Sequence, residues 1–112
     1  MTRYGSATEV TPHKLAEYLE NHANVWPAVL SRITASNIHN YSIFFRTFDD
    51  GRHILFTYFE YTGDHFDADM AAIAADPETQ RWWTFCAPCQ EPLASRAEGE
   101  HWAMMEQVFH VS

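Results

Sequence analysis

The sequence predicts an α+β fold of the split βαβ, ferredoxin-like type, with an antiparallel sheet. The apolar residues of the first third recur at helical spacing, and an Asp-Gly turn in the middle joins two apolar segments with strand character. The expected elements follow the order strand, helix, strand, strand, helix, strand. At 112 residues the chain is expected to form a single domain, residues 1–112, around one hydrophobic core.

The charge and composition exclude several classes of partner. The formal net charge is -8, and Lys and Arg form no run. Nucleic acids and anionic membranes bind clustered basic residues, so we expect neither as a partner. No apolar stretch approaches the roughly 20 residues of a membrane span, and the first residues lack an apolar signal core. We therefore expect a cytoplasmic protein with free cysteine thiols.

The first third of the chain predicts a short strand at residues 3–10, followed by a helix. Thr11 is a good N-cap, and Pro12 would occupy the first helical position, where its missing N–H costs nothing. The helical pattern continues to about Ala35. Pro27 lies inside it and cannot donate a hydrogen bond to the preceding turn, so the helix is expected either to kink or to stop and restart there.

Within this helix, Tyr18, His22 and Trp26 are four residues apart and are therefore expected to share one face. The same face carries apolar residues at core-facing spacing, including Leu15 and Ile33. An imidazole between two aromatic rings can exchange protons near neutral pH, so this row is a candidate wall of an active site. The alternative is an ordinary core, in which the imidazole bonds a backbone group and the aromatic side chains only pack.

The middle of the chain predicts a β-hairpin with two apolar faces. Turn-forming residues at 37–40 precede expected strands at 41–48 and 53–61, which the turn Asp49-Asp50-Gly51 would join. A sheet with one solvated face would alternate apolar and polar residues, whereas both faces here are largely apolar. The helices of one chain can cover only one face. We therefore expect a homodimer in which two sheets pack face to face.

Two further helices are expected in the second half. Residues 66–74 have an amphipathic pattern, and Asp76 and Pro77 form a typical helix start. The helix that begins there carries Trp82 and Trp83. Neighbouring residues on a helix point about 100° apart, so one tryptophan can enter the core while the other lines a cleft.

The end of the chain predicts a loop over 87–99 and a last strand over 102–111. Cys86 and Cys89 form a CxxC pair just before and within this loop. A zinc site would need two more ligands, and a redox pair would be expected at a helix start, so neither role is expected. The histidines form no HxH or HExxH motif. The motifs therefore do not favour a metal site, but the sequence leaves open that three histidines converge in space or that a histidine is the axial ligand of a haem.

Four stretches occur in a characteristic order: EYLENHANVWP at 17–27, HNYSIFF at 39–45, QRWW at 80–83 and EQVF at 106–109. Together they resemble the L-rhamnose mutarotase family over nearly the whole chain. The resemblance implies a ferredoxin-like α+β dimer of the α/β-barrel type. It also implies an isomerase that interconverts the α and β anomers of a monosaccharide and uses neither metal nor cofactor.

The resemblance further implies roles for individual residues. The catalytic histidine of the family corresponds to His22. Its substrate-binding positions correspond to Tyr18, Tyr41, Trp82 and Trp83.

In the mechanism that follows, His22 or a group that it activates donates a proton to the sugar ring oxygen while the anomeric hydroxyl loses one. The ring opens to the aldehyde, and closure after rotation about the C1–C2 bond gives the other anomer. Trp26 is a possible further site residue. Glu60 and Asp64 are candidate bases by position only, and water is a third candidate.

Several alternatives stay open. The Asp-rich segment 63–79 and the stretch after Ala87 depart from the rhamnose pattern and favour L-fucose as a second possible substrate. The two sugars share a 6-deoxy-L-hexose frame and differ in hydroxyl orientation, so a site built for one would discriminate against the other. Small dimers of this fold class also include haem-degrading and cofactor-free monooxygenases. A non-catalytic sugar-binding module would keep the aromatic cleft without needing His22.

Overall fold

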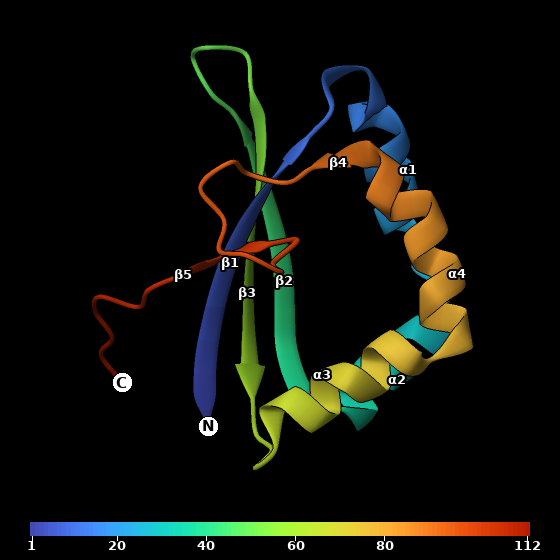
Figure 1. Cartoon of the computed structure of the whole chain (residues 1–112), viewed down its shortest axis with the longest axis vertical. Helices are drawn as coiled ribbons and strands as arrows, with labels where there is room; N and C mark the ends of the chain where they lie inside the picture. The colour runs from blue at the N-terminus through green and yellow to red at the C-terminus, as the bar shows by residue number, and fades with distance from the viewer.

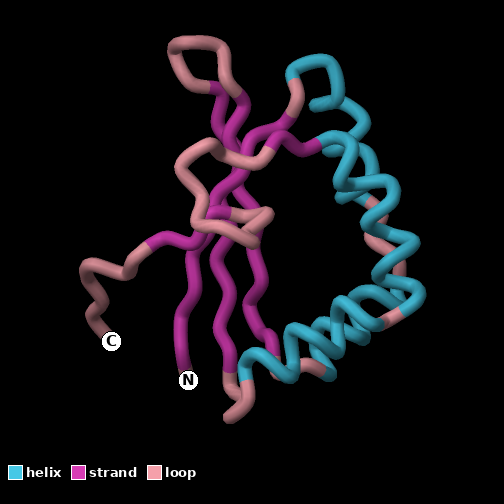
Figure 2. Tube along the Cα trace, in the orientation of Figure 1, coloured by secondary structure: helices cyan, strands magenta, loops and turns pink.

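The computed structural model describes residues 1–112 and contains one antiparallel sheet and four α-helices. The strands are β1 (Thr2–Val10), β2 (Ile38–Thr47), β3 (His53–Tyr61), β4 (Gln90–Glu91) and β5 (Ala103–Met105). The helices are α1 (Leu15–Ala23), α2 (Pro27–Ala35), α3 (Phe66–Ala75) and α4 (Pro77–Cys86), with the 3-10 turns η1 (Pro12–Lys14) and η2 (Ala87–Cys89). The helices all lie on one side of a curled sheet, and they leave its other face uncovered (Figure 1 and Figure 2).

The sheet is built around β1 and β3. These strands pair antiparallel along their whole length, from Thr2 opposite Tyr61 to Val10 opposite His53. The other edge of β3 pairs with β2, and the other edge of β1 pairs with both β4 and β5. The strand order is therefore β2-β3-β1-β4, with β5 also on β1. The mixed α+β class and the antiparallel sheet are confirmed.

The N-terminal helical region is divided at Pro27, as one of the two alternatives predicts. Helix α1 ends at Ala23, and α2 begins with the proline in its first turn, where a missing N–H loses no partner. Trp26 has an extended backbone and precedes α2. The expectation that it continues one helical row is therefore wrong, because the helix stops before it.

Of the two expected capping residues, Asp76 makes a capping hydrogen bond and Thr11 does not. The Asp76 carboxylate accepts hydrogen bonds from the Thr79 N–H at 2.9 Å and from the Thr79 hydroxyl at 2.8 Å, which confirms the predicted start of α4. Thr11 precedes Pro12 at the start of η1, but its side chain makes no capping hydrogen bond. None of the helices has the length and apolar character needed to cross a membrane.

The last strand is shorter than the sequence predicts. Instead of residues 102–111, only β5 pairs with the sheet, and from Glu106 onward the chain forms no strand. Three apolar side chains of this tail are 89%, 79% and 73% exposed: Val108, Phe109 and Val111. The expected loop over 87–99 contains η2 and β4.

Strand β2 begins earlier than expected and contains a β-bulge. Ile38 is already paired with β3, and the pairing shifts by one residue between His39 and Ser42. Asn37 and Asn40 have positive φ angles of 66° and 50°. The turn predicted over 37–40 is therefore wrong in its length, because the strand already begins at Ile38. Both asparagines nevertheless adopt the left-handed backbone conformation for which asparagine is favoured in turns.

The hydrophobic core lies between the sheet and the helices. Near the start of α1, Tyr18 packs with Val10 and Leu55. At the opposite end of β3, Phe59 and Tyr61 pack with side chains of α2 and α3. A third cluster joins the helices to one another: Val29, Trp82 and Cys86. This cluster holds α2 and α4 next to each other over one face of the sheet.

The other face of the sheet is apolar and open. Phe44 is 64% exposed and Phe48 is 39% exposed, and they lie on this face with the half-buried Phe56 and Tyr58. The expectation that both faces of the hairpin are largely apolar is therefore confirmed. In the single chain, no helix covers the second one.

Candidate active site

The candidate site is centred on two side chains of α1 that face the sheet. Tyr18 and His22 lie one helical turn apart, and their rings stack at a centroid distance of 4.1 Å and an interplanar angle of 22°. Tyr18 is 2% exposed, whereas His22 is half-buried. The i, i+4 spacing recognised in the sequence therefore produces a direct contact between a phenol and an imidazole.

The hydrogen bonding of His22 fixes its tautomer. The Nδ1 atom lies 3.0 Å from the Tyr18 carbonyl oxygen, which can only accept a hydrogen bond, so Nδ1 carries the proton. Burial lowers the pKa of His22 and outweighs the opposing effect of this hydrogen bond. At neutral pH the imidazole is therefore neutral, and its Nε2 atom is an unprotonated acceptor without a protein partner.

The aromatic wall beside His22 comes from α4 and from the segment before α2. Trp82 contacts His22 edge to face at 5.4 Å and contacts Trp26 in the same way at 5.4 Å. Phe85 packs against Trp26 at 5.7 Å, and the Arg81 guanidinium lies 5.6 Å from the centre of the Trp26 ring. Trp26 thus reaches this wall from the chain between the helices.

Tyr41 approaches the same region from the sheet. Its ring stacks almost parallel on Phe59, at 6° and 5.7 Å, on the face covered by the helices. Burial of the hydroxyl, followed by the nearby Cys86 thiol, raises the pKa of Tyr41 to about 12. Even so, 41% of the residue surface is accessible. The helices therefore do not close over this part of the sheet.

The hydroxyl of Tyr18 is buried without a hydrogen-bond partner. Burial, with a smaller contribution from Tyr41, raises its pKa, so the phenol remains protonated. The side chain of Gln90 lies beside it and lowers its pKa slightly, while the Gln90 Oε1 atom lies 2.5 Å from His101 Nε2. An unpaired buried hydroxyl costs roughly 1–3 kcal/mol, and a hydroxyl-bearing ligand would supply the missing partner.

The structure does not bring all sequence-based candidates to this place. Trp83 is 44% exposed and makes none of the aromatic contacts of Trp82, as expected for neighbours about 100° apart. Glu60 alternates with Phe59 along β3, so its side chain lies on the uncovered face. Within one chain, neither side chain reaches His22.

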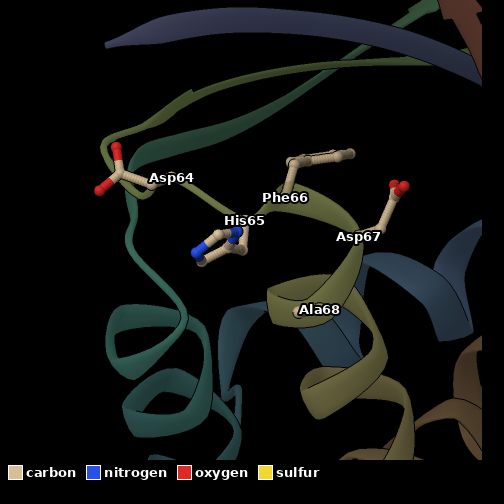
Figure 3. Close-up of a pocket in the computed structure, with 5 residues that line it drawn as sticks. All are labelled: Asp64, His65, Phe66, Asp67 and Ala68. Atoms are coloured by element: carbon tan, nitrogen blue, oxygen red, sulfur yellow. The ribbon is translucent and has the colours of Figure 1, made fainter.

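Asp64 lies in the loop between β3 and α3. It lines an open hollow together with His65, Phe66, Asp67 and Ala68. In Figure 3 the Asp64 and Asp67 carboxylates point away from each other, so they form no common binding site. No three His, Cys, Asp or Glu side chains of the chain converge as metal ligands.

Two residues near Tyr18 were not assigned to the site from the sequence. Cys86 lies close enough to Tyr18 and Tyr41 to affect both pKa values, and Gln90 lies beside the Tyr18 hydroxyl. The position of Cys86 had a signal, because it follows Trp82 by four residues on one helix face. Gln90 had none, because its place depends on the pairing of β4 with β1.

A model of the L-rhamnose mutarotase family matches residues 3–111. The chain belongs to the L-rhamnose mutarotase family. A relative named L-rhamnose mutarotase from Jannaschia sp. (strain CCS1) is 33% identical over 91 residues, covering 81% of this chain and 82% of the relative. Another from Sinorhizobium fredii is 29% identical over 113 residues and covers 100% of both chains. A crystal structure of an L-rhamnose mutarotase from Formosa agariphila has the same fold, with a TM-score of 0.75 over 100% of both chains at 20% identity.

Membership of the L-rhamnose mutarotase family confirms the resemblance of the four sequence stretches. Mutarotases are isomerases that interconvert sugar anomers, so the chain is an enzyme of this class. The match covers Tyr18, His22, Tyr41 and Trp82, which the fold gathers between the sheet and the helices. Their individual roles stay predictions.

Proposed function

We propose that this enzyme interconverts the α and β anomers of L-rhamnose at the site formed by Tyr18, His22, Tyr41 and Trp82. One observation carries the proposal: a neutral imidazole with a free Nε2 atom stacks on a tyrosine whose buried hydroxyl has no partner. A sugar brings hydroxyl groups and apolar C–H faces. The sugar hydroxyl groups can form hydrogen bonds with the unpaired polar atoms, and the C–H faces can pack on the surrounding aromatic rings.

The tautomer of His22 supports a definite order of proton transfers. With Nδ1 bonded to the Tyr18 carbonyl, Nε2 takes the proton of the anomeric hydroxyl. The C1–O5 bond then breaks, and the ring oxygen takes a proton from a neighbouring donor, such as a tyrosine hydroxyl or water. Rotation about C1–C2 exposes the other carbonyl face. Closure reverses both transfers, so His22 donates its proton in the second half of the reaction.

The tyrosines suit this scheme because they retain their protons. The pKa of Tyr41 is about 12, and that of Tyr18 is also raised above its ordinary value by burial. Protonated phenols donate hydrogen bonds to sugar oxygens across the physiological pH range. Trp82 supplies an apolar wall whose ring plane lies at 66° to the imidazole. We expect this wall to contact the C–H face or the C6 methyl group of the sugar.

We also propose that two chains pair through the uncovered face of the sheet. Phe44 and Phe48 expose apolar area there, and a second copy is the simplest cover for it. The strand order β2-β3-β1-β4 further supports the ferredoxin-like topology. Phe44→Glu would place a charge on this face and should convert a dimer into monomers in analytical ultracentrifugation. A monomeric parent protein would contradict the proposal. A cytoplasmic location stays a prediction.

The proposed activity is tested by proton NMR on equilibrated sugars. One anomeric proton is irradiated and the other is observed, first with L-rhamnose and separately with L-fucose. We expect saturation transfer at low enzyme concentration with L-rhamnose and weaker transfer with L-fucose, since the two differ in hydroxyl orientation. Stronger transfer with L-fucose would reassign the substrate. A folded protein that transfers saturation with neither sugar would contradict the proposed activity and favour a binding module.

A further inference from the structure

On the uncovered face, two side chains donate hydrogen bonds to the carboxylate of a third. The Tyr58 hydroxyl donates to Glu60 Oε2 at 2.7 Å, and the Asn40 amide donates to Glu60 Oε1 at 2.9 Å. Glu60 thus accepts one bond on each carboxylate oxygen. Arg3 is opposite Glu60 on β1, and His39 is opposite it on β2. This environment holds the carboxylate in place and leaves it far from His22.

Asn40 is the residue that creates the bulge in β2. Its φ of 50° is in the left-handed region, which asparagine tolerates better than most residues. Ile38 pairs opposite Tyr61 before the bulge, and Ser42 pairs opposite Tyr58 after it, so one extra residue is inserted between them. A bulge of this kind redirects the side chains that follow it.

The extra residue decides which way Tyr41 points. Ile38 and Tyr41 are three positions apart, so in a regular strand they would lie on opposite faces of the sheet. Here both face the helices: Ile38 is buried in the core, and Tyr41 stacks on Phe59. The bulge therefore allows one strand to bury Ile38 and also to present Tyr41 to the site.

We propose that Glu60 is a positioning residue, which holds the Asn40 bulge from the uncovered face and thereby keeps Tyr41 aimed into the active site on the covered face. The inference rests on the proposed function for its kinetic consequences, but the orientation of Tyr41 can be measured without it. It also replaces the expectation that Glu60 acts as the base.

The decisive pair of variants is Glu60→Ala and Glu60→Gln. Alanine removes both acceptors. Glutamine can keep both bonds, because its oxygen accepts from Tyr58 and its amide nitrogen donates to the Asn40 side chain once that amide turns over. We expect Glu60→Ala to lower kcat/KM about tenfold to a hundredfold, as for a misplaced site residue, and Glu60→Gln to retain activity within about threefold. A folded but inactive Glu60→Gln would contradict positioning and indicate proton transfer by the carboxylate.

Thr47→Ala is the matched control. It removes a 2.8 Å hydrogen bond between Thr47 and His53, which joins the same two strands near the hairpin turn. Its stability is expected to fall as much as that of Glu60→Ala, whereas its kcat/KM should stay unchanged. Equal kinetic losses in both variants would mean that any weakening of the hairpin slows the enzyme, and the positioning role would be overturned.

Two readouts separate this inference from the proposed function. In a Tyr41→Ala background, Glu60→Ala should cause no further kinetic loss, because both changes remove the same contact. Independently of any substrate, the ring-to-ring nuclear Overhauser effect between Tyr41 and Phe59 should be present in the parent protein and in Glu60→Gln, and lost in Glu60→Ala. Retention of this signal in Glu60→Ala would overturn the inference even if the enzyme acts on L-rhamnose. Its loss would support the inference even if no sugar is turned over.

Discussion

The two faces of the sheet differ in how their polar groups are satisfied. On the face covered by helices, the buried Tyr18 hydroxyl has no partner, and burial raises its pKa. On the uncovered face, Glu60 has a donor on each oxygen, and these hydrogen bonds, first that of Tyr58, lower its pKa. Buried polar groups are nearly always paired in folded proteins. Because the Tyr18 ring stacks on His22, we expect its unpaired hydroxyl to bind the sugar under the proposed function.

The largest effect is expected for His22→Ala, which removes the proton acceptor from the covered face. General acid–base catalysis contributes about a hundredfold to ten-thousandfold, so kcat/KM for anomer exchange should fall by at least about a hundredfold. The exposed His13→Ala is the matched control and should match the parent protein. A folded His22→Ala protein that keeps full activity would contradict the proposal that the active site lies on the covered face.

The next largest effect is expected when Trp82 of α4 is replaced, and its neighbour Trp83 provides the comparison. Trp82 is 7% exposed and Trp83 is 44% exposed. Trp82→Ala should lower the free energy of unfolding by about 3–5 kcal/mol, because it leaves a cavity between α2 and α4. Trp83→Ala should lower it by only about 0.5 kcal/mol. Urea denaturation measures both, and equal losses would show that the side chains do not diverge as described.

The smallest effect is expected for Tyr18→Phe, which tests the unpaired hydroxyl of the covered face directly. Tyr18→Phe removes only the unpaired hydroxyl, so the free energy of unfolding should stay constant or rise. The rate of anomer exchange should fall about tenfold, the value of one lost hydrogen bond to substrate of about 1.4 kcal/mol. Thermal denaturation and saturation transfer on the same sample test both parts. A less stable protein with an unchanged rate would mean that the hydroxyl is structural.

Much of the fold was predictable because its signals are local. The Asp-Gly turn, the apolar hairpin and the Asp76-Pro77 helix start each depend on neighbouring residues. The bulge at Asn40 and the early end of the last strand were not predictable, because they depend on pairing with distant strands. The same limit applies to Gln90, which reaches Tyr18 only through sheet pairing.

The residues of the candidate site also differ in whether local sequence signals could predict their positions. The contact of Tyr18 with His22 follows from helical spacing and was predictable. Tyr41 was assigned through family resemblance, and its approach depends on a register shift that the pattern does not show. Glu60 was a candidate base by position along the chain. Alternation along β3 instead puts it on the face opposite His22.

The proposed mechanism requires that His22 be unprotonated when it accepts the proton of the anomeric hydroxyl. The imidazole has a free Nε2 atom and a pKa lowered by burial, so we expect the unprotonated form to be the active one. The measurement is the rate of L-rhamnose anomer exchange against pH, beside a nitrogen-15 NMR titration of His22. The rate is expected to rise with pH through a His22 pKa below about 6.5 and then to stay level. A rate that is highest when His22 is protonated would contradict the proposed mechanism.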